Sequence, residues 1–470
     1  MKIFPQEVYL HGLGKFPDYC YSVDISWSPS GVGKTYVVTG GADSVARVWT
    51  VNEKSFQLEI HSELTGHQLG VNCVRFAPDG TNTIATASDD GKVCIWKQQL
   101  LDLSNPTAEH RWVQGRVLNV LDEVVGIAWS PCGTMIVAAV QREMSHVFSV
   151  QTGRLLARLD GHTNRVTGVT WDPLNQLIVS QSSDRTCRIY AKKKNGSWYP
   201  KALLKDVDDT ACEALATAQI ATVSDDPIGD LLKDPAELIN TTVQKKSVTN
   251  KWKLFISESH YPNDPTAHFF RRPDFSPDGS MIVVPGGLSD AGDSGVSFVT
   301  HLFARRSLST GQAPTATFTT PCAPSMAVRF HPRPFVASEA DVAPFYVFAV
   351  TTVSSFYVLR SDRGKPIAFA TDLHCTAIVD ASWSSDAKIL ALSSTDGYVT
   401  LIRFSEGELG GVPDWSGFVP TAVASDKATP ADVPQTGENE NSEMTRHENL
   451  PAEMSKGEKR RITPIIVTKE

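Results

Sequence analysis

The chain has 470 residues, of which 41% are hydrophobic and 20% are charged, an ordinary composition for a soluble globular protein. Its formal net charge of −8 excludes a protein that binds nucleic acid through overall basic charge. The eight cysteines include no C-x-x-C pair, so we expect free thiols in a reducing compartment rather than disulfides or a zinc site.

The amino-terminal segment lacks the long apolar core of a signal peptide. Apolar runs such as 135–140 are too short to span a bilayer, and we expect an intracellular, soluble protein. Residues 2–10 precede the first of the repeats described below and form an apolar, strand-like segment. We expect this segment to supply a strand that the last repeat lacks, which would remove an exposed sheet edge.

A unit of three strands, separated by turns that contain Pro, Asp or Gly, recurs seven times. The first strand of each unit ends near an aromatic marker; the markers are Trp27, Phe76, Trp129, Trp171, Phe275, Phe330 and Trp383. Most markers are 42 to 55 residues apart, and one gap is 104 residues. This period is typical of four-stranded propeller blades. The sequence therefore predicts an all-β fold with one seven-bladed WD-repeat β-propeller over 1–404.

The stretch GVGKT at 31–35 resembles part of a phosphate-binding loop. The full motif requires a glycine five residues before Gly33, where this chain has Ser28, and a helix should follow. The following residues, YVVTGG, instead favour a strand. We interpret the stretch as a blade turn.

Two units contain a Gly-His pair followed by serine, aspartate and an aromatic residue, which resembles the hydrogen-bond relay of WD repeats. The predicted relay residues are His67, Ser88, Asp90 and Trp96 in the second unit, and His162, Ser182, Asp184 and Tyr190 in the fourth. A buried polar chain is tolerated when every member has a partner. Because the same set recurs in separate units, we favour a structural role over a catalytic Ser–His–Asp site.

Three segments outside the repeats differ in composition. The long gap predicts an insertion at about 192–268 between the fourth and fifth blades. Residues 405–458 carry 11 acidic and three basic residues, which predicts a disordered acidic linker. Residues 459–470 carry four basic residues and one acidic residue, with an apolar stretch between them. We expect this tip to be a short linear motif.

The segments 166–190, 268–287 and 380–404 resemble the middle, WD-repeat subunits of chromatin assembly factor one. HIRA-type histone regulators are close relatives of that family but usually carry a large second domain, and this chain has only about 65 residues after the propeller. The tip KRRITP at 459–464 is similar to the motif with which both families bind the anti-silencing-function histone chaperone.

This resemblance implies a nuclear, non-enzymatic scaffold that helps deposit newly made histones three and four onto replicating DNA. Its partners would be the large subunit, the small histone-binding WD-repeat subunit and the anti-silencing-function chaperone. Histones would be bound directly or through these partners. The alternatives are HIRA-type, replication-independent deposition and a generic adaptor, for example in ubiquitin-ligase substrate recognition. We expect no cofactor, no metal, no membrane association and no sequence-specific DNA binding.

Two groups of residues are candidate contacts with these partners. The chaperone-binding set is Lys459, Arg460, Arg461, Ile462, Thr463 and Pro464; a nuclear-import signal is the alternative interpretation. The candidate contact with the large subunit is Phe269, Phe270, Arg271 and Arg272, because aromatic and arginine side chains dominate interface energetics. The alternative is that the phenylalanines belong to the core.

Overall fold

A computed structural model provides the structure of this protein. It describes residues 1–6, 18–26, 35–52, 54–100, 110–205, 252–253, 269–290, 296–308, 314–320, 323–336 and 344–413. No helix in these residues is long and apolar enough to cross a membrane.

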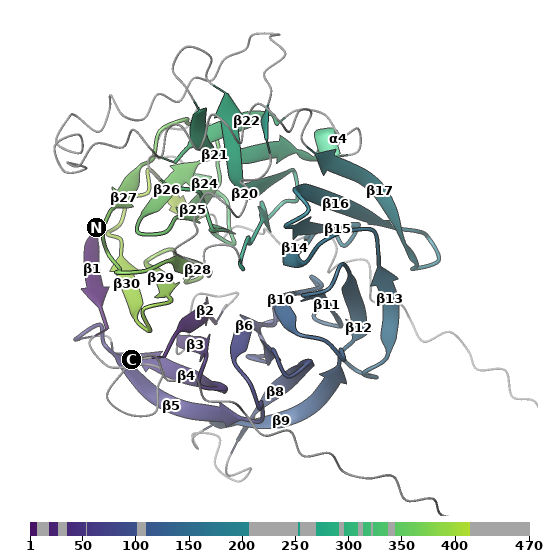
Figure 1. The fold of residues 1–470 in the computed structure, drawn as a ribbon. Helices are drawn as coiled ribbons and strands as arrows, with labels where there is room; N and C mark the ends of the chain where they lie inside the picture. Colours follow the sequence, from purple (N-terminus) through teal and green to yellow (C-terminus); the bar gives the residue numbers. More distant parts are fainter. Residues whose placement is uncertain are drawn as a thin grey trace, which may run out of the picture. The chain divides into compact units, whose positions relative to one another are not determined.

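Seven antiparallel sheets are arranged in a ring around a central channel (Figure 1), which confirms the predicted seven-bladed β-propeller. Blade one contains β2 (Cys20–Ile25), β3 (Tyr36–Gly41), β4 (Val45–Val51) and β5 (Leu58–Thr65). Blade two contains β6 (Val71–Phe76), β7 (Ile84–Ser88), β8 (Lys92–Leu100) and β9 (His110–Asn119). Blade three contains β10 (Val124–Trp129), β11 (Met135–Val140), β12 (Ser145–Ser149) and β13 (Leu155–Leu159). Blade four contains β14 (Val166–Trp171), β15 (Leu177–Ser182), β16 (Thr186–Lys192) and β17 (Trp198–Lys205).

The last three blades differ in how their strands are supplied. Blade five contains β19 (Asp274–Phe275), β20 (Met281–Asp290), β21 (Val296–Ala304) and β22 (Ala316–Thr319), with β18 (Trp252–Lys253) as a second partner of β20. The short helix α4 (Arg305–Leu308) follows β21. Blade six contains β23 (Ala327–Phe330), β25 (Val347–Thr351), β26 (Phe356–Arg360) and β27 (Ala368–Ala370). Blade seven contains β28 (Ile378–Trp383), β29 (Ile389–Ser394), β30 (Val399–Arg403) and, from the amino terminus, β1 (Lys2–Pro5).

Strand β1 closes the ring, as the sequence predicts. It pairs antiparallel with β30, with Ile3 opposite Ile402. Immediately after β1, the buried Gln6 accepts a hydrogen bond from the Leu58 amide at 2.7 Å and so connects blade seven to blade one. The outer edge of β30 is therefore covered, which removes a site for unwanted strand pairing.

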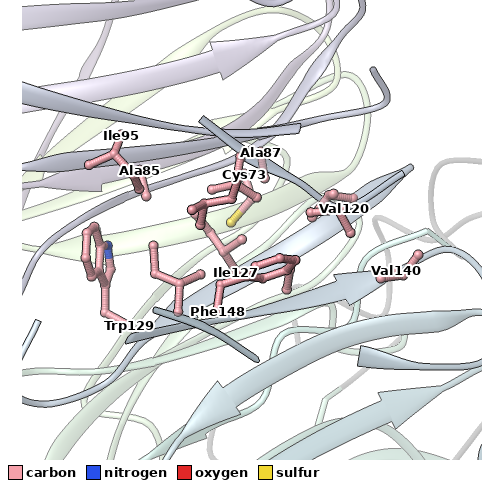
Figure 2. Close-up of a cluster of buried hydrophobic side chains, with 14 of the residues drawn as sticks. Cys73, Ala85, Ala87, Ile95, Val120, Ile127, Trp129, Val140 and Phe148 are labelled. Atoms are coloured by element: carbon pink, nitrogen blue, oxygen red, sulfur yellow. The ribbon is translucent and has the colours of Figure 1, made fainter. Parts of the chain in front are cut away.

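The core lies between neighbouring blades, where the apolar faces of their sheets pack together. Figure 2 shows one such cluster, in which Cys73, Ala85 and Ile95 of blade two face Ile127 and Trp129 of blade three. The inner strands β6 and β14 are buried along their whole length, which explains why they are rich in apolar residues on both faces.

Six of the seven predicted markers are the last residues of inner strands, from Phe76 at the end of β6 to Trp383 at the end of β28. Blade one differs. Its inner strand ends at Ile25, and Trp27 lies outside the described residues. The backbone amide of Ser26 bonds to the carbonyl of Tyr36 just as that of Ser384 bonds to Ile389. Ile25 therefore occupies the place of Trp383, and the predicted marker Trp27 lies two residues past the end of the inner strand.

The predicted insertion at 192–268 also begins too early. Residues 198–205 form β17, the outer strand of blade four, in which Ile189 of β16 lies opposite Ala202. The lysine-rich sequence before it is the turn between β16 and β17. Within the rest of the predicted insertion, only residues 252–253 are described, and they form β18.

The described structure continues past the predicted boundary at residue 404. The two-residue strand β31 (Val412–Pro413) pairs with β24 (Phe335–Val336) of blade six. Leu409 is buried in the cluster between blades six and seven, so this extension belongs to the propeller. Residues 414–470, and with them most of the predicted linker, lie outside the described residues.

Candidate functional site

The predicted relay of blade two connects β7 and β8 to the segment that precedes β6. The two ring nitrogens of His67 contact Asp90 Oδ2 at 3.0 Å and Thr86 Oγ1 at 2.8 Å. Trp96 Nε1 donates to the same Thr86 hydroxyl at 2.9 Å. The hydroxyl of the relay thus comes from Thr86, two residues before the predicted Ser88. Ser88 instead accepts a hydrogen bond from the Asp90 amide and donates to the Leu69 carbonyl.

Blade four has the same arrangement with one change. His162 contacts Asp184 at 2.8 Å and Ser180 at 2.7 Å, whereas the predicted Ser182 caps the turn by accepting from the Asp184 amide. Tyr190, in the place of the tryptophan, donates to the Asp160 carbonyl at 3.0 Å. Successive side chains in a strand point to opposite faces, so residues an even number of positions apart lie on the same face. That period does not distinguish position 180 from 182.

Burial and hydrogen bonding act in opposite directions on these groups. Burial lowers the pKa of His67, although the neighbouring Asp90 opposes this effect. Burial acts to raise the pKa of Asp184, but hydrogen bonds from His162, Thr186 and the Thr163 amide outweigh it and lower the pKa to about 2. The aspartate therefore stays ionised at neutral pH as a fixed acceptor, which suits a structural connection between strands.

A third relay is present in blade seven, where sequence analysis did not identify one. His374 contacts Asp396 Oδ2 at 3.0 Å and Thr400 Oγ1 at 3.0 Å. Leu373 replaces the usual glycine before the histidine, which hid the pattern. The turn sequence STDG at 394–397 was the available signal.

The candidate contact residues 269–272 lie at the channel, not on an open surface. The segment precedes β19, and β18 occupies the adjacent edge of β20. The Arg271 amide therefore bonds to the Thr167 carbonyl of blade four, and the Arg272 amide bonds to the Met326 carbonyl beside blade six. Residues 271 and 272 thus connect the two blades on either side of their own.

Three of these four side chains are buried. Phe270, Arg271 and Arg272 are 3%, 7% and 5% exposed, and Phe269 is partly buried. Phe270 packs on Tyr21 with ring centroids 5.7 Å apart, and the Arg272 guanidinium lies 4.7 Å from the Phe270 ring. A contact with another subunit would need exposed side chains. The arginines and Phe270 instead contact the propeller itself. For Phe270 this agrees with the alternative that the phenylalanines belong to the core.

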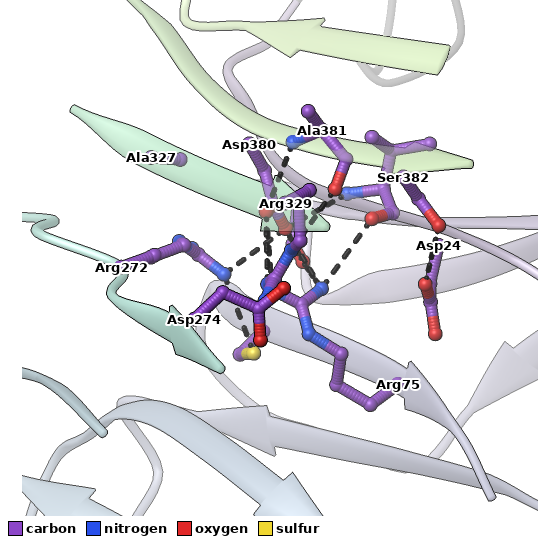
Figure 3. Close-up of polar contacts among 12 residues, drawn as sticks. Asp24, Arg75, Arg272, Asp274, Ala327, Arg329, Asp380, Ala381 and Ser382 are labelled. Carbon is purple, nitrogen blue, oxygen red and sulfur yellow. Dashed lines mark hydrogen bonds and ion pairs between the residues drawn. The ribbon is translucent and has the colours of Figure 1, made fainter. Parts of the chain in front are cut away.

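Asp380 is the centre of this ionic cluster (Figure 3). It is fully buried, and Arg75 donates to both of its carboxylate oxygens, at 2.8 and 3.0 Å. Arg272 and Arg329 donate to it at 3.0 and 3.2 Å, and Ser22 donates at 2.7 Å. The donors come from blades one, two and six and from the segment before β19, so one carboxylate joins four parts of the ring.

Arg272 extends this connection across the channel. Besides Asp380, its guanidinium donates to the Tyr21 carbonyl at 3.1 Å and to the Asn72 carbonyl at 2.9 Å. These acceptors belong to the first two blades, whereas its backbone bonds to the sixth. Removing one partner from such a buried ionic group typically costs about 3–5 kcal/mol. We call Arg75, Arg272, Arg329 and Asp380 the channel cluster.

Two further aspartates of the inner strands connect adjacent blades. Asp24 accepts from the Phe76 amide and from Ser382, both at 2.7 Å. Asp274 accepts from the Phe330 amide at 2.8 Å. Burial raises the pKa of both, and that of Asp274 to about 7, despite the amide hydrogen bonds. Each aspartate therefore lies just before the last residue of its inner strand and accepts the amide of the marker residue in the following blade.

The clusters described here perform structural tasks, because each charged group is held by partners within the propeller. No group of three metal-ligating side chains occurs in the part of the chain that the structure describes. The chaperone-binding candidates 459–464 lie outside the described residues.

Comparison with known proteins identifies a matching domain family over the propeller. The domain model described as the CAF1B/HIR1 beta-propeller domain matches residues 1–226 and 214–409. Chromatin assembly factor 1 subunit FAS2 homolog of Oryza sativa subsp. japonica is 34% identical over 80% of this chain and 69% of its own length. A chromatin assembly factor 1 subunit of Mus musculus is 28% identical over 80% of this chain and 62% of its own length.

Two groups of relatives match at lower identity. A chromatin assembly factor 1 subunit of Saccharomyces cerevisiae is 25% identical, over 91% of this chain and 93% of its own length. Fungal proteins named HIR1 also match, at 23–24% identity, and the chain covers 33–48% of them.

Proposed function

Because the chain belongs to the CAF1B/HIR1 β-propeller family, we propose that it is the middle, WD-repeat subunit of a chromatin assembly factor. The observation that carries this proposal is the 34% identity to a chromatin assembly factor subunit, compared with at most 24% to the HIR1 proteins. In this role the propeller is a nuclear, non-enzymatic scaffold. It holds the large and small subunits together while histones three and four are deposited on newly replicated DNA.

The architecture supports a scaffold rather than a catalyst. The channel, where propeller enzymes place their reactive groups, is crossed here by Arg272 and by its ion pair with Asp380 at 3.0 Å. The relays connect strands within single blades, and the channel cluster connects blades to one another. A ring connected in this way presents its faces and rim as surfaces for partners. Function in this fold depends on those surfaces.

Depletion from a nuclear extract tests the proposal. We expect loss of the protein to abolish nucleosome assembly on a replicating plasmid, measured by nuclease protection, and to spare assembly on a non-replicating plasmid. Adding back the purified chain should restore assembly. A defect confined to the non-replicating plasmid would instead establish HIR1-type deposition, and a defect on neither plasmid would favour a generic adaptor.

We propose further that Lys459, Arg460, Arg461, Ile462, Thr463 and Pro464 bind a histone chaperone of the anti-silencing-function type. The support is the sequence alone. Ile462 and the β-prone residues after it suit addition of a strand to a partner sheet. Pro464 restricts Thr463 to extended backbone, which lowers the ordering cost of binding.

The tail proposal is tested with Ile462→Ala. Burying this side chain in an apolar groove is worth about 1.5–3 kcal/mol, so the variant should bind the purified chaperone about tenfold more weakly or worse. Leu450→Ala, outside the motif, is the matched control and should bind normally. Equal binding by both variants would contradict the proposal. Loss of nuclear localisation when Arg460 and Arg461 are replaced by Ala, with normal binding by Ile462→Ala, would favour the import-signal interpretation.

A further inference from the structure

The outer strands of blades two, three and four carry basic side chains and no acidic ones. Within 110–119, 154–159 and 192–205 the sequence contains no aspartate or glutamate. The exposed bases in these ranges are Arg111, Arg116, Arg154, Arg158, Lys193, Lys194, Lys201 and Lys205. We call these eight residues the basic rim.

The basic rim is a continuous surface. Figure 1 shows β9, β13 and β17 as the outermost strands of three consecutive blades. The Arg116 side chain of blade two lies beside Gly153 of blade three, where an added Cβ would come within 3.0 Å of Arg116 Cδ. Strands β13 and β17 also contact each other. Charges on the three strands therefore lie along one edge of the ring.

None of the eight bases forms an ion pair among the residues that the structure describes. Elsewhere some exposed bases have acidic partners, as Arg142 has in Asp122 and Lys388 in Asp386, and others such as Lys54 stand singly among the described residues. The chain has a net charge of −8, so the residues outside the rim sum to −16, that is, −8 minus +8. Surfaces shaped only for solubility mix both signs. An acidic molecule that gathers eight bases along one edge has a polarised field.

We propose that the basic rim binds the phosphate backbone of duplex DNA without sequence preference. The charges follow the edge of three blades rather than surrounding a groove, which suits a long polyanion with evenly spaced charges. Both arginine and lysine side chains bind phosphate oxygens, and such contacts position a protein on DNA without reading its bases. This binding would hold the subunit on the DNA onto which histones are delivered, and it does not depend on which histones or chaperones it carries.

Charge reversal in the full chain tests the proposal, with one substitution per blade: Arg116→Glu, Arg154→Glu and Lys201→Glu together. The matched control reverses three exposed bases elsewhere, Lys54→Glu, Arg363→Glu and Lys365→Glu, and produces the same change of net charge. The probe is a fluorescein-labelled 30-base-pair duplex, and its anisotropy is measured from 50 to 200 mM salt. Thermal melting of each variant shows that it is folded.

We expect the rim variant to bind the duplex at least tenfold more weakly than the control variant. The slope of log affinity against log salt should also fall by about 3, since each lost phosphate contact removes about 0.9. Equal weakening in both variants, or no binding by the wild type at 50 mM salt, would overturn the proposal. So would displacement of the duplex by a polyglutamate peptide at equal charge concentration. That result would assign the rim, with the exposed Leu155 and Leu156 beside it, to an acidic protein partner.

Discussion

Among single residues, Asp274 makes the stability of the propeller depend on pH. Its folded pKa of about 7 lies above the ordinary value of an aspartate in an unfolded chain. The folded state therefore binds the proton more tightly, and the stabilisation is complete below pH 4 and is lost as the pH rises towards 7. The largest slope from one group is about 1.4 kcal/mol per pH unit.

Replacing Asp274 with Asn should remove this dependence. We expect the free energy of unfolding of the wild type, minus that of Asp274→Asn, to fall between pH 5 and pH 8, because folding of the wild type takes up a proton in this range and folding of the variant does not. Urea denaturation at the two pH values measures both proteins, and the other titrating groups cancel in the difference. A difference that stays constant or rises with pH would contradict the assigned pKa.

Individual residues also show which contacts a sequence pattern cannot predict. The histidines and aspartates of the two predicted relays are in place, but the hydroxyl partners are Thr86 and Ser180 rather than Ser88 and Ser182. Both positions of each pair face the same side of the strand. The ion pair between Arg75 and Asp380 joins residues 305 positions apart, and no local pattern contains such a pairing. Burial of Arg272 was equally hidden, because arginine is rarely found inside a protein.

At the level of strands, Gly168 in β14 allows residues 271–272 to enter the channel. A Cβ added at position 168 would lie 1.7 Å from the Arg271 carbonyl oxygen and 2.8 Å from the carbonyl carbon. Both atoms belong to the backbone, so the contact cannot be relieved by a rotamer change. Gly126 occupies the same position after the bulge in β10 of blade three, and a Cβ there would meet nothing within 4 Å.

Alanine substitution at each of these two glycines tests whether the glycine is needed for close packing or only adds backbone freedom. We expect Gly168→Ala to lower the free energy of unfolding by about 1–3 kcal/mol or more, as overpacking does. Gly126→Ala should be neutral or slightly stabilising, because the unfolded chain loses freedom and the folded chain gains no clash. Chemical denaturation of both variants measures this. Equal effects would show that the segment before β19 does not press against β14.

The sequence predicts the strands best where blades are regular. Inner strands with both faces buried and an aromatic end were identified in six blades, because burial demands apolar residues throughout. The prediction failed where tertiary contacts replace the pattern. Blade one ends its inner strand with Ile25, and β17 follows a lysine-rich turn that resembles a solvated loop. The two-residue strand β18 is too short to produce any period.

The first and last blades are joined in two places, at the outer rim and at the central channel. At the rim, β1 pairs with β30, Gln6 bonds to the Leu58 amide, and the amino group of Met1 pairs with Glu408. At the channel, Asp380 of blade seven holds Ser22 of blade one and Arg75 of blade two. The two closures are independent, because no residue takes part in both.

Removing residues 1–6 should therefore open the rim and leave the channel closed. We expect the shortened protein to melt at a lower temperature and to aggregate with increasing concentration, since β30 then presents an unpaired edge. Amide exchange should quicken in β30 and at Leu58, whereas the inner strands β6 and β28 stay protected by the channel cluster. Mass-resolved hydrogen exchange measures both regions in one experiment.

Lys2→Ala, which keeps the strand and removes only an exposed side chain, is the control and should behave like the wild type. Equal melting and exchange in the shortened protein would show that β1 contributes nothing to closure. Loss of protection throughout the ring would instead show that the channel cluster cannot hold blades seven, one and two together without the rim.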